Sequence, residues 1–328
     1  MPNTSPPMDD PSLVRDLLER ARSADATVYT TACATRGMRG EDCPDFAALK
    51  EAGAIALSDD GRPVANACCL LEALQAGEEL GLTVAAHCED LDLARGGLMN
   101  QGETARQLGV KAVPPAAEDC GVARELAAAA SIGARVHICH VSTAGSVALI
   151  RDAKRRGVRV TAETCPHYLL LTDRALESMD ADYRMNPPLG SEADRLALIE
   201  GLRDGALDAI STDHAPHTPE EKGDFFTAPN GSIGMETSLA AVLTALNGWL
   251  SLSQVIEKMS AAPARILGIP AGTLAVGAPA DVVVFDPEEK WTVDPARLHG
   301  KSRNTPFKGM ELTGRVKLTF SRGRRVFG

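Results

Sequence analysis

The chain has 328 residues, 44% of them hydrophobic, which is enough for one large domain or for a large domain with a small one. Its net charge of −10, without any long basic run, argues against a nucleic-acid partner. No apolar run approaches the roughly 18 residues of a membrane span, so we expect a cytoplasmic protein without a membrane partner. The eight cysteines form no CxxC pair and indicate neither a disulfide framework nor a structural zinc site.

The first helix is predicted directly after Asp10, which can cap it, with Pro11 at the first helical position. Beyond it, β-rich runs alternate with amphipathic helical stretches such as 145–157, which ends at Gly157. Each β-rich run is apolar enough to be covered on both faces, as in a parallel sheet. Six strands are predicted, within residues 26–33, 53–60, 82–90, 135–142, 158–165 and 207–213.

The pattern changes at about residue 270. Residues 280–293 and 314–327 are rich in strand-forming residues, and the second run alternates apolar and polar side chains. We therefore predict an α/β fold with two parts: residues 1–269 form a partial βα-barrel catalytic domain, and residues 270–328 form a small β-rich layer.

Polar residues end four of the six predicted strands. Asp60, His87, His140 and Asp213 lie far apart in sequence, and a barrel would bring them together because its strand ends meet at one mouth. Two imidazoles with carboxylates suit zinc, and a carboxylate that bridges two ions suits a binuclear hydrolytic site. The sequence predicts metal-assisted hydrolysis.

Nearby candidates have simpler interpretations. Asp59 is expected to cap a helix, and His137 should lie on the opposite face of its strand from His140 in a structural role. His214 is expected to support its neighbours. Two further histidines are expected outside the site: His167 in packing and His299 without a functional role.

Several stretches stand out along essentially the whole chain: "SDDGRPV", "AHCEDL", "HVSTAGSV", "MNPPL", "STDHAPHTPEEK", "ADVVVFDP" and "NTPFKGMELTGRV". Together they resemble the dihydroorotase family of the amidohydrolase superfamily. This resemblance implies a zinc-dependent TIM-type (β/α)8 barrel of the metal-dependent hydrolase kind, here with about six barrel strands. The activity it implies is reversible cyclisation of N-carbamoyl-L-aspartate to L-dihydroorotate in de novo pyrimidine synthesis.

The resemblance also implies roles for single residues. Asp60 would bridge two zinc ions, His87 and His140 would bind one of them, and Asp213 would bind the other and shuttle the proton. Substrate would be held by Asn3, Asn186 and His217, with the loop around Gly231 closing near it.

The chain departs from the family pattern in its first part. It has no histidine-x-histidine-x-arginine motif, so Met1 is predicted to be an internal methionine and the chain to lack an N-terminal segment. At most one zinc site would then be intact, and activity would be weak or absent. Gly190 and Asn230 replace an arginine and an aromatic residue that are common in the family, and both could weaken substrate positioning.

Two alternatives remain. Hydantoinases, dihydropyrimidinases and allantoinases are similar in fold, but they usually bridge their metals with a carboxylated lysine, and Asp60 occupies that place. The chain could also be a non-catalytic, dihydroorotase-like scaffold subunit of an aspartate transcarbamoylase assembly. The expected partners are a small-molecule substrate and either a second copy of the chain or the transcarbamoylase.

Overall fold

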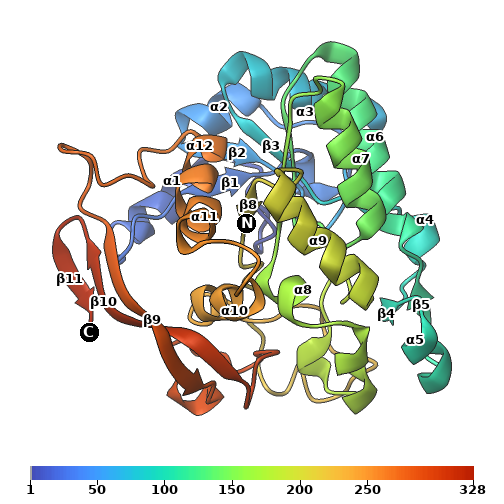
Figure 1. Cartoon of the computed structure of the whole chain (residues 1–328). Helices are drawn as coiled ribbons and strands as arrows, with labels where there is room; N and C mark the ends of the chain where they lie inside the picture. The colour runs from blue at the N-terminus through green and yellow to red at the C-terminus, as the bar shows by residue number, and fades with distance from the viewer. Residues whose placement is uncertain (1) are drawn as a thin grey trace.

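A curled sheet of six parallel strands, open on one side, forms the centre of the computed structural model, which describes residues 2–328 (Figure 1). The strand order is β1-β2-β3-β6-β7-β8, and every neighbouring pair is parallel. All six predicted strands and the α/β barrel type are confirmed. The strands are β1 (Thr30–Ala32), β2 (Ala54–Leu57), β3 (Thr83–Ala86), β6 (Val136–Ile138), β7 (Val160–Thr164) and β8 (Ala209–Ile210).

Helices that connect these strands cover the outer face of the sheet (Figure 1). The Asp10 side chain accepts a hydrogen bond from the Ser12 amide, which confirms the predicted cap of the first helix. Helix α1 (Pro11–Ala21) precedes β1, and the connecting helices are α2 (Phe46–Glu51), α3 (Ala67–Leu80), α6 (Ala116–Ile132), α7 (Ala144–Arg155) and α9 (Glu192–Asp204).

Shorter elements occupy the loops and the last part of the barrel. One pair of two-residue strands, β4 and β5, was not predicted, since each is too short to show an alternating pattern. The prediction about Met1 falls outside the described residues. The shorter elements are η1 (Arg36–Met38), α4 (Leu91–Ala94), β4 (Met99–Asn100), α5 (Glu103–Leu108), β5 (Ala112–Val113), α8 (Pro166–Leu170), η2 (Asp173–Ser178), η3 (Ala181–Tyr183), α10 (Ser238–Ala245), α11 (Leu252–Ile256), η4 (Glu257–Ala261), α12 (Ala262–Leu267) and η5 (Pro295–Arg297).

The two faces of the curled sheet differ in polarity. On β6, Val136 and Ile138 belong to the main apolar core, whereas His137, and Cys139 directly after the strand, line a cavity on the inner face. Glu163 lines the same cavity from β7. Because successive side chains of a strand point to opposite faces, the sheet can pack helices outside and gather polar groups inside.

Helix α12 covers part of the inner face of the sheet, near the residue at which β3 begins. The Thr83 hydroxyl, at the start of β3, donates a hydrogen bond of 2.7 Å to the Ile266 carbonyl of α12. Pro263, Ile266 and Leu267 line the inner cavity, whose volume is about 290 Å³. No helix in the described part of the chain is long and apolar enough to cross a membrane.

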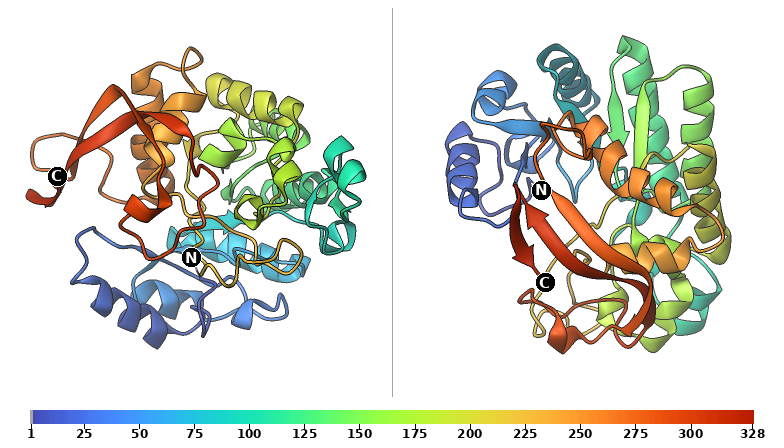
Figure 2. Two further views of the ribbon diagram at one scale, coloured as in Figure 1. Left: turned by 90° about the horizontal axis from the view of Figure 1, so that it is seen from below. Right: turned by 60° about the vertical axis from the view of Figure 1, so that its left-hand side comes forward.

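An antiparallel sheet formed by the C-terminal strands lies beside the barrel (Figure 2). Its order is β11-β10-β9, which confirms the predicted β-rich C-terminal segment, and the division at residues 269 and 270 stays a prediction. Leu312 and Phe307 pack with Ala240 and Ala241 of α10, so an apolar contact joins the two parts. The strands are β9 (Val282–Thr292), β10 (Glu311–Ser321) and β11 (Arg324–Phe327).

Gly121 allows α6 to pack closely against the loop that follows β3. A Cβ added there would lie 2.7 Å from the Glu89 amide nitrogen and 2.8 Å from the Cys88 carbonyl carbon, both backbone atoms.

We expect Gly121→Ala to lower the free energy of unfolding by about 1–3 kcal/mol in urea denaturation, because the backbone must shift. Ala127→Ser, at an exposed position of the same helix, is the control and should change stability little.

Candidate active site

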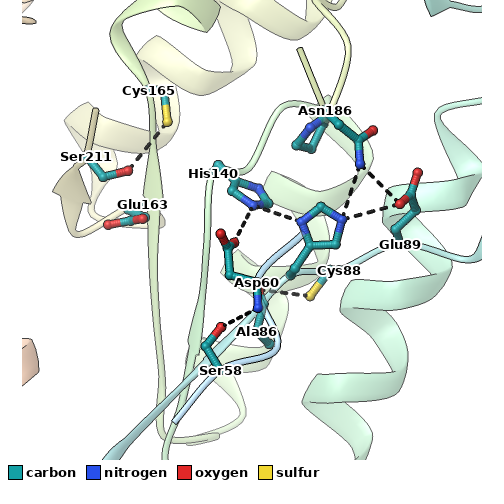
Figure 3. Close-up of polar contacts among 12 residues, drawn as sticks. Ser58, Asp60, Ala86, Cys88, Glu89, His140, Glu163, Cys165, Asn186 and Ser211 are labelled. Carbon is teal, nitrogen blue, oxygen red and sulfur yellow. Dashed lines mark hydrogen bonds and ion pairs between the residues drawn. The ribbon is translucent and has the colours of Figure 1, made fainter. Parts of the chain in front are cut away.

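Three of the four predicted ligands meet at the carboxyl ends of β2, β3 and β6. His140 Nε2 lies 3.3 Å from Asp60 Oδ1 and 3.0 Å from His87 Nδ1, and all three side chains are buried. Their candidate ligand atoms lie within 4.8 Å of one another. Figure 3 shows the Asp60 carboxylate directed at the His140 ring, with Glu89 and Asn186 facing each other at the other end of the cluster.

The buried Glu118 of α6 fixes the loop that follows His140. Its carboxylate accepts hydrogen bonds from the Ser142 amide at 3.0 Å and from the Thr143 amide at 3.2 Å. Burial raises the pKa of Glu118, and these hydrogen bonds oppose that shift by stabilising the anion. His140 has a φ of 38°, in the left-handed region, so the chain turns at this residue.

Asp59 ties the ends of β1 and β2 together. Its carboxylate accepts hydrogen bonds from the Ala34 amide at 2.8 Å and the Thr35 amide at 3.0 Å. The expectation that Asp59 caps a helix is wrong, since Asn66 caps the next helix, α3. The Asp59 contacts hold the strand end that precedes Asp60.

Charge and burial shape the protonation of the cluster. Burial alone would lower the pKa of His140, but its hydrogen bond with Asp60 and the charge of that carboxylate raise it to about 9. Burial would raise the pKa of Asp60, yet the contact with His140 brings it below its usual value. Without a metal, the cluster therefore favours an ion pair between imidazolium and carboxylate.

The donor set fits a divalent metal ion such as zinc. A tetrahedral zinc ion with bonds of about 2.1 Å holds its donors about 3.4 Å apart, close to the distances of His140 Nε2 from His87 Nδ1 and from Asp60 Oδ1. The buried Nδ1 of His140 has no hydrogen-bond partner among the described residues. An ion at Nε2 would not give this Nδ1 a partner; the feature that favours a metal here is the convergence of the three candidate ligand atoms.

Glu89 was missed from the sequence, although it lies two residues after His87 at the same strand end. Glu89 Oε2 lies 3.3 Å from His87 Nε2 and accepts a hydrogen bond of 3.2 Å from Asn186 Nδ2. If His87 Nε2 carries its proton toward Glu89, the lone pair of Nδ1 is directed at the metal position. Glu89 therefore orients both the imidazole and the Asn186 amide.

Asp213 lines the inner cavity with Asp60 and His140 but lies outside the three-residue ligand group. Burial raises its pKa, and the neighbouring carboxylates of Asp60 and Glu163 act in the same direction. Its φ is 46°, which turns the chain out of β8 toward the mouth. A carboxyl group with a raised pKa beside the cluster is suited to carry a proton.

The predicted substrate residues have different surroundings, and none of them lines the inner cavity. Asn186 contacts the cluster directly. His217 Nε2 lies 3.0 Å from the Asn230 carbonyl, next to the buried Gly231. Asn3 is exposed, and its Nδ2 would lie 3.5 Å from a Cβ added at Gly61, directly after Asp60.

His137 also lines the inner cavity, so the expectation that it faces away from His140 is wrong. The left-handed turn at His140 brings both rings to the interior. His137 Nδ1 lies 2.9 Å from Thr161 Oγ1, and its Nε2 lies 3.4 Å from Glu163 Oε2. With Cys139 and Glu163, His137 forms a second group of three residues whose candidate ligand atoms lie within 4.8 Å of one another.

The other histidines lie where the sequence suggested. His214 Nδ1 accepts a hydrogen bond of 3.1 Å from the Gly234 amide and so supports the loop that carries Asp213. His167 is buried against Tyr168, and burial lowers its pKa to about 3. His299 is exposed and lies 2.8 Å from Glu236.

The two departures from the family pattern have different surroundings. Asn230 Oδ1 accepts a hydrogen bond of 3.0 Å from the Arg184 guanidinium, so this side chain anchors its loop. The Gly190 carbonyl accepts the Asp173 amide at 2.8 Å, and a Cβ at this glycine would lie 2.9 Å from the Asp194 Cβ. A side chain at position 190 would need local rearrangement.

Comparison with known proteins gives consistent results. The model of the amidohydrolase family matches residues 31–326. The chain is 48% identical to a curated dihydroorotase of Syntrophus aciditrophicus (strain SB) and 47% identical to one of Geobacter sp. (strain M21), covering 100% of this chain and 78% of each relative. Among solved structures, it resembles the L-hydantoinase (dihydropyrimidinase) from Arthrobacter aurescens with a TM-score of 0.86 and 26% identity, over 100% of this chain and 76% of that one.

We expect Glu89→Gln to weaken zinc binding about 10- to 100-fold, because the amide orients the His87 imidazole less strongly than the carboxylate does. Competition with a chromophoric chelator measures this affinity without any need for turnover. Asp92→Asn, at an exposed residue of the adjacent helix α4, is the matched control. Equal zinc affinity of Glu89→Gln and the native chain would rule out this role of Glu89.

Proposed function

Because this chain belongs to the amidohydrolase family and, within it, to the dihydroorotases, we propose that it interconverts N-carbamoyl-L-aspartate and L-dihydroorotate. The observation that carries the proposal is the buried contact of Asp60 with the His140 and His87 pair, with Asp213 in the same cavity. This reaction makes or breaks one cyclic amide bond, which requires a polarised carbonyl, an activated water and a proton carrier.

Zinc is the proposed metal. Asp60, His87 and His140 would hold one ion, and Asp60 with Asp213 would contribute to a second. When bound, the metal supplies Lewis-acid polarisation and lowers the pKa of its water. The expectations that a complete site takes two ions, and that at most one site is intact in this chain, stay predictions.

The chain's own residues would bind the substrate and move the proton. Asp213, whose pKa burial raises, would exchange a proton with the reacting amide nitrogen. The Asn186 amide, next to the ligand cluster, would hydrogen-bond the substrate, and His217, Asn3 and the Gly231 backbone would hold its other polar groups. Glu89 would keep Asn186 and His87 in the orientations that these tasks need.

The alternatives receive less support. Among the described residues that line the inner cavity none is a lysine, so the carboxylated lysine typical of the other cyclic amidases has no counterpart there. A scaffold without activity would not need a buried set of two imidazoles and two carboxylates, whose desolvation is costly. We further propose a cytoplasmic location, and pairing with a second copy or with an aspartate transcarbamoylase stays a prediction.

Asp213→Asn should lower kcat for dihydroorotate hydrolysis about 10²- to 10⁴-fold, because the amide cannot carry the proton. Zinc bound at the histidine pair should remain measurable by metal analysis. Asp92→Asn serves as the control, and removal of metal by a chelator should abolish the native activity. The kcat/KM of the native chain in the same assay tests the expectation that its activity is weak.

Dihydrouracil and hydantoin should be poor substrates in parallel assays. Faster turnover of either compound than of dihydroorotate would replace the proposal with a different cyclic amidase. Metal binding without turnover of any cyclic amide would favour the scaffold.

A further inference from the structure

The segment 211–237 connects β8 to α10 and carries His217 and Gly231, both proposed substrate contacts. It forms no helix or strand, and its regular pairing is limited to one bridge between His214 and Ser232. A long segment of this kind needs side-chain ties to keep one conformation, since ordering each residue costs conformational entropy.

Lys222 supplies three of these ties. Its Nζ donates to the Pro229 carbonyl at 2.9 Å, the Gly231 carbonyl at 2.9 Å and the Arg184 carbonyl at 3.3 Å. An ammonium group has three N–H donors, and here each one has a carbonyl acceptor. The side chain therefore joins the outgoing arm of the segment to its returning arm and to the residue that follows η3.

Asn304, from the C-terminal part of the chain, supplies the second set. Its buried side chain donates from Nδ2 to the Gly231 carbonyl at 3.1 Å and the Ala215 carbonyl at 3.0 Å. Its Oδ1 accepts a hydrogen bond of 3.2 Å from the His217 amide. The Gly231 carbonyl thus receives both Lys222 and Asn304.

The two arms approach closely where these ties act. Gly231 has a φ of 128°, and a Cβ there would lie 2.5 Å from the Ala215 Cβ and 3.1 Å from His217 Nε2. The Gly231 amide donates to the Arg184 carbonyl at 2.9 Å. Movement of the Gly231 backbone would therefore also change the position of the His217 ring.

The charges around Lys222 indicate that it does not serve to neutralise a carboxylate. Among the described residues, none of the acidic side chains forms an ion pair with Lys222. The charges of Asp182 and Asp180 act to raise its pKa, but these two carboxylates pair with Lys308, at 3.4 and 3.0 Å. Burial lowers the pKa of Lys222 to about 8, and the like charge of Arg184 acts in the same direction. The polar contacts of the Lys222 ammonium group are thus its three hydrogen bonds to carbonyls, which fix the positions of the backbone segments that carry them.

We propose that Lys222 and Asn304 are positioning residues that hold His217 and the Gly231 backbone in the substrate-binding arrangement, so that the C-terminal part completes the active site. The inference rests on the proposed function in one respect, namely that His217 and Gly231 contact the substrate. Asn304 belongs to the "NTPF" stretch, which would thus help to position the substrate-binding loop.

The first test is hydrogen exchange of the full chain carrying Lys222→Met, which keeps the apolar stem but removes all three donors. Exchange of the Ala215 and Gly231 amides should accelerate about tenfold or more, since several hydrogen bonds that hold their partners are lost. Lys258→Met is the matched control, because Lys258 is also partly buried and donates to a carbonyl, that of Leu207 before β8. It should leave exchange in 211–237 unchanged.

The second test is kinetic. In Lys222→Met and in Asn304→Ala, KM for dihydroorotate should rise about tenfold, while zinc content stays that of the native chain. Unchanged exchange in Lys222→Met, or equal acceleration in Lys258→Met, would overturn the proposal. If Lys222→Met does not fold, the exchange of Asn304→Ala is measured instead and judged by the same criterion. If neither of these variants folds, Lys222→Gln takes their place.

The two proposals can fail separately. Exchange and zinc content are measured without turnover, so a native chain that does not convert dihydroorotate refutes the proposed function but leaves the tie between the two arms measurable. Conversely, an active chain whose Lys222→Met variant keeps native exchange and KM retains the function and refutes the positioning role.

Discussion

The contact of His140 with Asp60 and His87 is the constraint on which the rest of the site depends. It places two imidazoles and a carboxylate from three neighbouring strand ends in a buried volume, where each polar group needs a partner. The curl of the parallel sheet brings the three strand ends together, and Glu118 holds the loop after His140 so that its ring stays in place. A metal ion at this position would bind the three candidate ligand atoms of Asp60, His87 and His140, which lie close together.

Polarity is divided between the two faces of the sheet. The outer side chains of β6 pack into the apolar core that the helices cover, whereas the inner ones, with Glu163 of β7, form hydrogen bonds around the cavity. The same alternation that stabilises the barrel therefore builds a polar interior beside the cluster. Buried carboxylates in this interior repel one another, and this is one reason why the pKa of Asp213 rises.

The mouth of the cavity is built differently from its floor. Strands and short loops fix the ligand cluster, but the segment 211–237 depends on hydrogen bonds from Lys222 and from Asn304 of the C-terminal part. The C-terminal sheet also packs on α10, which follows this segment directly. Substrate binding would thus be sensitive to residues that are remote from the metal position in sequence.

The sequence by itself determined the six strands, the first helix and its cap, and the strand-end positions of Asp60, His87 and His140, because these depend on local patterns and on where a parallel sheet ends its strands. The roles of Glu89, Glu118, Lys222 and Asn304 were decided only by the tertiary structure. Each of them has a partner that is far away in sequence: Asn186 for Glu89, Ser142 for Glu118, Arg184 for Lys222 and Gly231 for Asn304. A single carboxylate, ammonium or amide in a sequence does not reveal which backbone groups it will meet, since that depends on how the sheet curls and how the long segment folds back over it.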